Sequence, residues 1–378
     1  MSQETKNQKP KTSIDFANLQ HQHNLYKEEI EEAILKVARD CNFIMGSQID
    51  ELERNLEKFT GSKYAISCSS GTDALLLAMM ALDIQPDDEI ITTPFTFFAT
   101  AETIAFLKAK PVFVDIDEKT YNIDPKKIEE KITPKTKAII PVSLYGQPAD
   151  MDEINQIAKK HNLKVIVDGA QSFGSTYKGE SDSNLGDISC TSFFPAKPLG
   201  CYGDGGALFT NDEKLADKIK SLRLHGQSIR YHHQYIGMGG RLDTIQAAVL
   251  NVKLKYYGKD LKLRQDVAEK YTKALNEKNI ETPFVKSDRT SAWAQYSIRV
   301  QNRTELQTKL QNLGIPTAVH YPMPLHVQEC FKYLNLKEGD FPISEKVSKE
   351  IMSLPMNPYV SDEEIEFIVE NLAKELRC

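Results

Sequence analysis

Short apolar segments alternate with amphipathic segments between residues 61 and 210 of this chain. The apolar segments have the length of a β-strand, and several are almost continuously apolar. Continuous apolar runs are typical of parallel strands that are buried on both faces of a sheet. The predicted strands are Ala65–Cys68, Glu89–Thr92, Pro111–Asp115, Ala138–Val142, Lys164–Val167, Ile188–Phe194 and Ala207–Thr210.

Helices are predicted between most of these strands. Examples are Ala99–Leu107, Met151–Lys160 and Glu213–Leu222, where the segments have the length and composition of helices. Alternation of strands and helices is typical of the α/β class. This part of the chain is therefore predicted to form a sheet rich in parallel strands, covered by helices on both faces.

The flanking segments predict further helices. Residues 26–40 carry Ile30, Ala33, Ile34 and Val37 at helical spacing, as expected for an amphipathic helix. After the sheet region, apolar residues at three-and-four spacing predict a long helix, and a second helix is predicted near Lys262–Leu275. The apolar positions of the long helix are Leu242, Ile245, Val249 and Val252.

The pattern changes after residue 280, where strands and helices become fewer and a proline-rich loop appears. The predicted elements are a strand at Ala294–Val300, a helix at Glu305–Leu313, a strand at Thr317–His320, and a last helix with the capping box Ser361-x-x-Glu364. We therefore expect three parts: a flexible tail at 1–13, a large α/β domain at 14–260, and a small α+β domain at 261–378.

The composition narrows the function classes. The chain has 378 residues and a formal net charge of -6, without long basic runs, so no nucleic-acid partner is expected. Its six cysteines are scattered, which argues against a zinc site or a disulfide framework and suits a reducing compartment. No secretory signal is predicted, and the apolar run Ala74–Leu82 is too short to span a membrane. We expect a cytoplasmic protein without a metal site.

Lys197 is the first residue with candidate chemistry. It lies in an aromatic, Gly/Pro-rich segment, Ser192–Gly206, where nothing local needs its charge. A partly desolvated lysine loses its proton readily and can form a Schiff base with an aldehyde such as pyridoxal phosphate. A solvated lysine in a mobile loop would account for this segment equally well.

Two further segments favour the chemical interpretation. Ser69–Leu75 is a Ser/Gly/Thr turn that enters a helix after a predicted strand, and its free amides suit a phosphate. An ordinary helix N-cap would have the same sequence pattern. Asp168 ends the apolar run Val165–Val167, where it can face a pyridine nitrogen or cap the next turn. The order of phosphate turn, strand-end carboxylate and lysine within one α/β pattern favours a pyridoxal phosphate site.

Together these segments resemble the pyridoxal-phosphate-dependent sugar aminotransferases of the DegT/DnrJ/EryC/StrS family. The resemblance runs from about residue 15 to the C-terminus. It implies an α/β fold of the fold-type I, aspartate aminotransferase-like kind, and a homodimer with active sites at its interface. The motifs are SGTDAL at 70–75, TPFTFFATAE at 93–102, PVFVDID at 111–117, VSLYGQPADMD at 142–152, DGAQS at 168–172, SFFPAKPLGCYGDGGA at 192–207, RLDTIQAA at 241–248 and SLPMNPY at 353–359.

The resemblance also implies roles for individual residues. Lys197 matches the lysine that forms the Schiff base and later moves the proton between cofactor and sugar. The cofactor's binding residues would then be the phosphate-binding Gly71, Thr72 and Ser192, the stacking Phe97, Asp168 at the pyridine nitrogen and Gln171 near the ring hydroxyl. Phe97 also suits a core aromatic.

Three features of the chain bear on this assignment. Relatives that carry histidine in place of the lysine are dehydratases, so Lys197 favours transamination. Many relatives carry asparagine where this chain has Gly239, and that asparagine reaches across the dimer to the phosphate. That contact is therefore expected to be missing or to be made by another group. Val167 stands where glutamate is frequent, and we expect no effect from it.

The segments 225–237 and 314–326 resemble most closely the enzymes that act on UDP-2-acetamido-2-deoxy-3-oxo sugars, best known for the 3-oxo-glucuronate form. In that subgroup Arg241, His320 and Tyr321 would face the substrate from the neighbouring subunit, and a guanidinium suits a carboxylate. The implied reaction is a ping-pong transfer from L-glutamate, leaving 2-oxoglutarate, to C3 of a UDP-linked keto sugar. The 3-amino sugar nucleotide would serve surface polysaccharide synthesis. Arg241 also suits an interface ion pair, and His320 and Tyr321 also suit a loop anchor.

Other functions are compatible with the same residues. A neutral acceptor is one, either UDP-3-oxo-N-acetylglucosamine or a 3- or 4-oxo-6-deoxy sugar nucleotide. A non-catalytic regulatory protein that binds pyridoxal phosphate is a second. A third is a lyase of the same fold that acts on an amino acid without any sugar.

Overall fold

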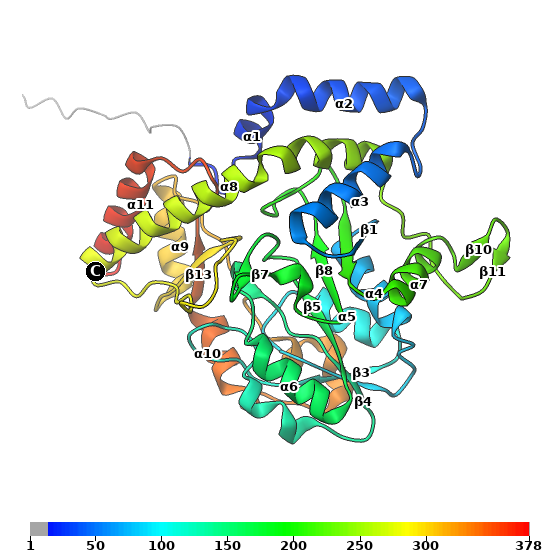
Figure 1. Ribbon diagram of the computed structural model, residues 1–378. Helices are drawn as coiled ribbons and strands as arrows, with labels where there is room; N and C mark the ends of the chain where they lie inside the picture. Colours follow the sequence, from blue (N-terminus) through cyan, green and yellow to red (C-terminus); the bar gives the residue numbers. More distant parts are fainter. Residues whose placement is uncertain (1–13, 378) are drawn as a thin grey trace, which may run out of the picture.

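The computed structural model of the chain describes residues 14–377, and the predicted tail at 1–13 lies outside them. Its centre is a seven-stranded sheet in the order β1-β9-β8-β5-β4-β2-β3 (Figure 1). Strands β3, β2, β4, β5 and β8 are parallel, while β9 runs antiparallel to both β8 and β1. These strands are β1 (Tyr64–Cys68), β2 (Glu89–Thr92), β3 (Lys110–Phe113), β4 (Thr136–Ile139), β5 (Lys164–Asp168), β8 (Ile188–Ser192) and β9 (Gly206–Thr210). Each of them overlaps one predicted strand, and the predicted α/β class is confirmed.

Helices cover both faces of this sheet, because alternate strand residues point to opposite sides and are apolar on both. One apolar cluster joins α4, α5 and α7 to residues such as Ile66 and Ile166. The opposite face packs Ala65 and Phe209 against α3 and α8, and Val165 against α6. The covering helices are α3 (Ser47–Thr60), α4 (Gly71–Ala81), α5 (Ala99–Phe106), α6 (Met151–His161), α7 (Glu213–Arg223) and α8 (Thr244–Glu277).

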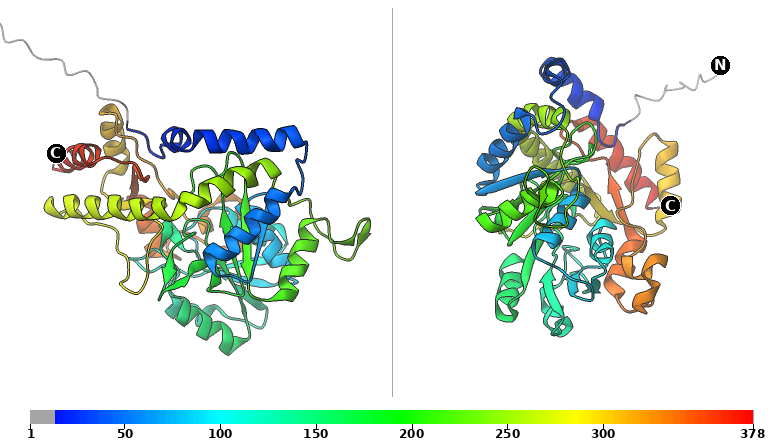
Figure 2. Two further views of the ribbon diagram at one scale, coloured as in Figure 1. Left: turned by 45° about the horizontal axis from the view of Figure 1, so that its top comes forward. Right: turned by 90° about the vertical axis from the view of Figure 1, so that its right-hand side faces the viewer.

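Two N-terminal helices, α1 (Leu19–Leu25) and α2 (Lys27–Asp40), lie outside this layer (Figure 2). Ile30 of α2 packs against Val249 and Val252 of α8, which confirms the amphipathic helix predicted over residues 26–40. Helix α3 was not predicted, although its apolar residues Ile49, Leu52 and Leu56 recur at helical spacing and are buried.

The C-terminal part surrounds a second apolar cluster, formed by the end of α8, a two-stranded antiparallel sheet and two helices. Its elements are β12 (Tyr296–Arg299), α9 (Arg303–Asn312), α10 (Pro342–Glu350), β13 (Ile351–Leu354) and α11 (Asp362–Glu375). Ser361 and Glu364 form the predicted capping box at the start of α11. The division into domains at 14–260 and 261–378 stays a prediction, and its boundary falls inside α8.

Two predictions for this part were wrong. The helices expected on either side of residue 260 form one continuous helix, α8, since no proline interrupts it and Gly258 costs only about 1 kcal/mol. Thr317–His320 is not a strand, because only Ala318 pairs, through a single bridge to Ser353. Pro316 and Pro322 flank this segment and remove backbone donors that a longer ladder would need.

Short elements complete the chain. The hairpin of β10 (Gln227–Ile229) and β11 (His232–His233) extends away from the body in Figures 1 and 2. The other short elements are β6 (Thr176–Tyr177), β7 (Glu180–Ser181), and the 3-10 helices Pro125–Lys127, Glu129–Lys131, Leu144–Gly146, Asp182–Asn184, Leu325–Val327 and Glu329–Leu334. Within residues 14–377, no helix combines the length and the apolar character needed to cross a bilayer.

Candidate active site

The candidate residues meet at one edge of the central sheet. Asp168 is the last residue of β5, and Ser192 is the last residue of the neighbouring parallel strand β8. Gly71 begins α4 directly against Ser192, and Lys197 follows Ser192 by one short turn. Since ligands of α/β sheets bind beyond the carboxyl ends of the strands, this edge is where a cofactor is expected.

The start of α4 provides an anion site. Ser70 caps the helix by accepting a hydrogen bond from the amide of Asp73 at 3.0 Å. The Asp73 carboxylate in turn accepts from the hydroxyls of Ser69 and Ser70. The amides of Gly71 and Thr72 donate to no acceptor among the residues described, so two helix N-terminal donors are left for a ligand.

Two glycines permit the close approach that builds this turn. A Cβ on Gly71 would lie 2.6 Å from the Cβ of Ser192, and a Cβ on Gly206 would lie 2.5 Å from the carbonyl of Ser70. Contacts this short mean that a side chain at either position would force the neighbouring atoms to move. The Ser192 hydroxyl therefore lies directly beside the free amides of α4.

Asp168 is buried and held by two donors. The Thr100 hydroxyl donates to its Oδ2 at 2.8 Å, and the Ala170 amide donates to its Oδ1 at 3.2 Å. Burial raises the pKa of Asp168, while these hydrogen bonds and the Lys197 ammonium oppose the rise. A cationic group that arrived at this carboxylate would therefore be bound favourably.

Lys197 lies half-buried in a tight loop. Its amide donates to the carbonyl of Phe194 at 2.8 Å, and the amide of Cys201 donates to the carbonyl of Phe193 at 2.8 Å. Desolvation lowers the pKa of the Lys197 ammonium, and Asp168 opposes this shift. The Lys197 ammonium forms no hydrogen bond or ion pair within residues 14–377, so it is available to a ligand.

Gln171, Phe97 and Tyr321 lie close together, and Tyr321 is near enough to Asp168 to feel its charge. The Gln171 side chain donates to the Tyr321 hydroxyl at 3.0 Å and accepts from the amide of Tyr145 at 2.7 Å. The rings of Phe97 and Tyr321 have their centroids 5.9 Å apart, and Phe97 is 55% exposed. An exposed aromatic ring at this edge leaves a face on which a cofactor ring can stack.

His320 and Tyr321 lie close to Lys197 and Gln171 of their own chain, and their expected contact with a substrate from the neighbouring subunit stays a prediction. The Nδ1 atom of His320 is 2.9 Å from the Ser353 hydroxyl. Burial and the nearby Lys197 lower the pKa of His320 to about 4, so the imidazole is neutral at pH 7. Burial and Asp168 raise the pKa of Tyr321.

Tyr145 was not predicted as part of the site. It lies within the VSLYGQ motif and has a left-handed backbone, with φ of 58°. Its amide binds Gln171, its hydroxyl donates to the carbonyl of His320, and its carbonyl accepts from Ala294 at 3.1 Å. A non-glycine residue in this conformation inside a matched motif is a signal, but the sequence alone does not show it.

Arg241 lies next to the turn at the start of α4, since the amide of Ser69 donates to the carbonyl of the preceding residue, Gly240, at 3.1 Å. Its half-buried guanidinium forms no ion pair with the part of the chain that the structure describes. A Cβ on the neighbouring Gly239 would lie 3.1 Å from the His225 ring. An asparagine at position 239 would therefore require His225 to move.

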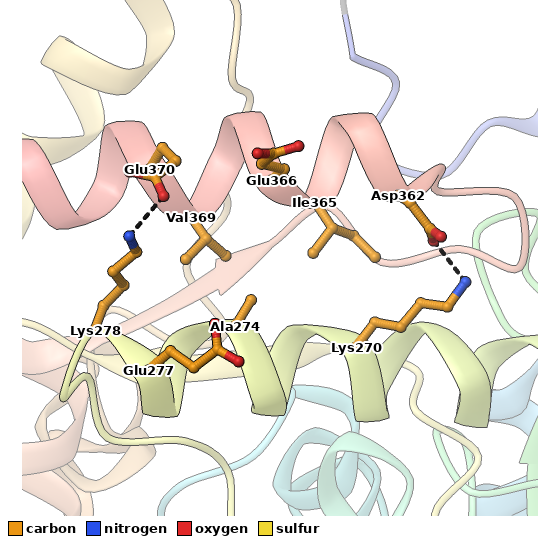
Figure 3. Close-up of a pocket in the computed structure, with 9 residues that line it drawn as sticks. All are labelled: Lys270, Ala274, Glu277, Lys278, Asp362, Ile365, Glu366, Val369 and Glu370. Atoms are coloured by element: carbon orange, nitrogen blue, oxygen red, sulfur yellow. Dashed lines mark hydrogen bonds and ion pairs between the residues drawn. The ribbon is translucent and has the colours of Figure 1, made fainter.

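A well-formed groove elsewhere lacks this chemistry. Figure 3 shows it between α8 and α11, closed at its ends by the ion pairs Lys270–Asp362 and Lys278–Glu370, both at 2.6 Å. Its floor is apolar, four of its charged side chains form these two ion pairs, and Glu277 and Glu366 also line it. Both lysines that line it are paired with carboxylates, and no residue from the ends of β5 and β8 lines it, so we assign the active site to the sheet edge.

The residues at the sheet edge fit pyridoxal phosphate. The two unpaired amides and the Ser192 hydroxyl suit its phosphate, buried Asp168 suits a protonated ring nitrogen, and half-buried Lys197 suits its aldehyde. The fit rests on donors and acceptors that are otherwise unpaired at one edge of the sheet.

Known aminotransferases match this chain over nearly its whole length. Residues 24–373 match the model of the DegT/DnrJ/EryC1/StrS aminotransferase family. A relative from Pseudomonas aeruginosa, UDP-2-acetamido-2-deoxy-3-oxo-D-glucuronate aminotransferase, is 50% identical over 94% of this chain and 98% of its own. A crystal structure of a DegT/DnrJ/EryC1/StrS aminotransferase from Brucella abortus has a TM-score of 0.93, with 38% identity over 96% of this chain and 99% of that one. NtdA from Bacillus subtilis, solved with bound cofactor PMP, has a TM-score of 0.90, with 32% identity over 99% of this chain and 87% of that one.

Proposed function

Since the chain belongs to the DegT/DnrJ/EryC1/StrS aminotransferase family, we propose that it moves the amino group of L-glutamate to C3 of a UDP-linked 2-acetamido-3-oxo sugar, with the 3-oxo-glucuronate form as its substrate. The observation that carries this proposal is the 50% identity, over nearly the whole chain, to an enzyme named for that substrate. The product is a 3-amino sugar nucleotide of the kind used for surface polysaccharides. The reaction is proposed for the cytoplasm, since scattered cysteines suit a reducing compartment.

The cofactor site is proposed to be the sheet edge. Bound pyridoxal phosphate supplies an electron sink that lets an amino group pass between an amino acid and a keto sugar. Gly71, Thr72 and Ser192 bind its phosphate, Asp168 holds a proton on its ring nitrogen, and Phe97 covers one face of the ring. Gln171 orients the ring hydroxyl, and it is fixed for this task by Tyr145 and Tyr321.

Lys197 is the proposed catalytic residue. Its lowered pKa increases the fraction of neutral amine at a given pH, and a neutral Nζ can accept a proton from a substrate carbon. Asp168 partly restores the ammonium form, so that the same Nζ can return the proton. This balance between desolvation and a nearby carboxylate suits a group that acts as base and acid in turn.

The sugar is proposed to bind beside Arg241, His320 and Tyr321. A guanidinium without a carboxylate partner among residues 14–377 is free to bind both oxygens of a C6 carboxylate. His320 is neutral at pH 7, so it acts as a hydrogen-bonding group and leaves the carboxylate to Arg241.

Two copies of the chain are proposed to pair and to complete each other's sites. Support comes from large apolar side chains on and beside the β10–β11 hairpin, where Ile229 is 70% exposed and Ile236 is 92% exposed. The exposed ring of Phe97 also leaves the cofactor edge open to a neighbour. Sedimentation of the purified protein should give twice the chain mass of 42.7 kDa.

The first experiment is the absorbance spectrum of the protein loaded with pyridoxal phosphate, before and after addition of glutamate. Loss of the yellow band and growth of the band of the aminated cofactor are expected from the first half-reaction. A cofactor that binds but does not respond to glutamate would contradict the proposed donor. It would favour the lyase or the regulatory protein instead.

The acceptor is then tested with matched sugars and matched variants. UDP-3-oxo-glucuronate and UDP-3-oxo-N-acetylglucosamine differ in the carboxylate at C6. Arg241→Lys and Arg241→Met should reduce kcat/KM on the order of 10- to 100-fold with the acidic sugar and much less with the neutral one. Equal losses with both sugars would sink the carboxylate assignment and favour a neutral acceptor.

A further inference from the structure

A second carboxylate lies buried behind the turn that carries Asp168. Asp182 begins the 3-10 helix Asp182–Asn184, and it is 2% exposed. The hydroxyl of Ser143 donates to its Oδ1 at 2.9 Å, and the hydroxyl of Ser172 donates to its Oδ2. The backbone amide of Asp182 donates to the carbonyl of Ser175 at 3.1 Å.

This carboxylate has hydrogen bonds but no counter-ion. No lysine, arginine or histidine of residues 14–377 forms an ion pair with Asp182. The charged group that acts on it is Asp168, on β5, and the other groups that face it are neutral serines and Gly169. Burial and Asp168 raise the pKa of Asp182 to about 6, so it is mostly ionised at pH 8 and mostly protonated at pH 5.

The two serines that donate to Asp182 also hold the backbone at and after Asp168. Ser143, which donates its hydroxyl to Asp182, also donates its amide to the carbonyl of Asp168 at 3.0 Å. Ser172 closes the turn after Asp168, with its amide donating to the carbonyl of Gly169 at 3.1 Å. A Cβ on Gly169 would lie 2.9 Å from Oδ2 of Asp182, so the carboxylate lies against the backbone of this turn.

We propose that Asp182 is a positioning residue for the cofactor: through Ser143 and Ser172 it fixes the turn that carries Asp168, and its charge strengthens the binding of a cationic ring at Asp168. This inference rests on the proposed role of Asp168. Nothing in the hydrogen bonding requires a charged group, because asparagine could make both contacts with the serine hydroxyls. The charge is therefore not needed to hold the turn, and we assign it to the binding of the cationic ring.

The physical basis is reciprocity between the two carboxylates. The charge of Asp168 disfavours ionisation of Asp182, and ionised Asp182 disfavours a lone charge on Asp168 to the same extent. A protonated ring nitrogen relieves this repulsion, since it is attracted by both carboxylates. The attraction is present when Asp182 is ionised and absent when it is protonated.

The test measures the dissociation constant of pyridoxamine 5′-phosphate at pH 8 and pH 5 for the wild type and three variants. Asp182→Asn keeps both hydrogen bonds and removes the charge. Ser172→Ala keeps the charge and removes one hydrogen bond. Asp187→Asn is the matched control, because Asp187 pairs with Lys164 at the opposite end of β5.

Asp182→Asn should weaken binding on the order of tenfold at pH 8, the effect of about one pKa unit, and should bind like the wild type at pH 5. Ser172→Ala should weaken binding equally at both pH values, and Asp187→Asn should have no effect. In the same variants, kcat should fall with Asp182→Asn while KM for the sugar stays unchanged.

Three results would overturn the proposal. Binding by Asp182→Asn that equals the wild type at pH 8 would leave the charge without a role. An equal loss at both pH values would make Asp182 a structural residue only. Failure of Asp182→Asn to fold would contradict the premise that the hydrogen bonds do not need the charge. A wild type that binds no cofactor would instead refute the proposed function.

Discussion

Replacing Asp182 with asparagine should stabilise the cofactor-free protein at neutral pH. The pKa of this carboxyl is about 6 in the folded chain, against 3.8 for an ordinary aspartate. Between these pH values the folded state binds more protons than the unfolded state. The contribution of Asp182 to the free energy of unfolding is therefore fully present below about pH 4 and is lost as the pH rises through 6. The shift of about 2 units corresponds to about 3 kcal/mol at pH 7.

The expected change in melting temperature follows from the size of the chain. An unfolding entropy of about 2.1 cal/mol/K per residue gives about 0.8 kcal/mol/K for the whole chain. A gain of about 3 kcal/mol therefore raises Tm by about 4 °C at pH 7. Since asparagine and protonated aspartate are both neutral, the two proteins should melt together at pH 4.

The assay is thermal unfolding followed by circular dichroism from pH 4 to pH 8, without added cofactor, because a bound ligand would itself shift Tm. The difference in Tm between Asp182→Asn and the wild type should grow through pH 5 and 6 and level off above pH 7. A variant that is less stable at pH 7, or a difference that does not depend on pH, would refute the reasoning.

Three further outcomes are expected. Lys197→Ala should keep the far-ultraviolet circular dichroism of the wild type and lose all response of the bound cofactor to glutamate. Gly71→Ala should lower the free energy of unfolding by about 1–3 kcal/mol and weaken cofactor binding, since its Cβ would meet Ser192 at 2.6 Å; urea unfolding and a binding titration measure the two effects. Arg223→Met should cost about 3–5 kcal/mol in urea unfolding, because the Glu53 carboxylate, 2.5 Å from the guanidinium and only 13% exposed, loses its counter-ion and keeps only the hydrogen bonds from Ser67. Adding Glu53→Leu should recover much of that loss, and no recovery would contradict the ion-pair explanation.

The sequence predicts the central sheet well because each buried strand is a short apolar run between polar turns. It also predicts the family, which the match over residues 24–373 confirms. Prediction fails where no residue marks a boundary. Helix α10 passes directly into β13 at Ile351 without a glycine or a turn, so the change of period is hidden in the sequence.

The candidate site likewise contains residues that the sequence predicts and residues that it does not. Lys197, Asp168 and Gly71 stand out because they lie in motifs whose order along the chain has a chemical meaning. Asp182 and Tyr145 do not, because their importance depends on which distant backbone and hydroxyl groups they contact. The placement of Tyr321 beside Gln171 of its own chain likewise depends on tertiary packing.

Helix α8 has a mechanical consequence for the molecule. Its first half buries Leu250 and Tyr257 in the cluster beneath the sheet, and its second half buries Tyr271 and Leu275 in the C-terminal cluster. A bend at residue 260 would break successive backbone hydrogen bonds of a continuous helix. The helix is thus a rigid element shared by two apolar cores, so any hinge between the cores must lie outside it. Unfolding of either core would expose the apolar residues of one half of this helix to water. The two cores should therefore melt as one cooperative unit.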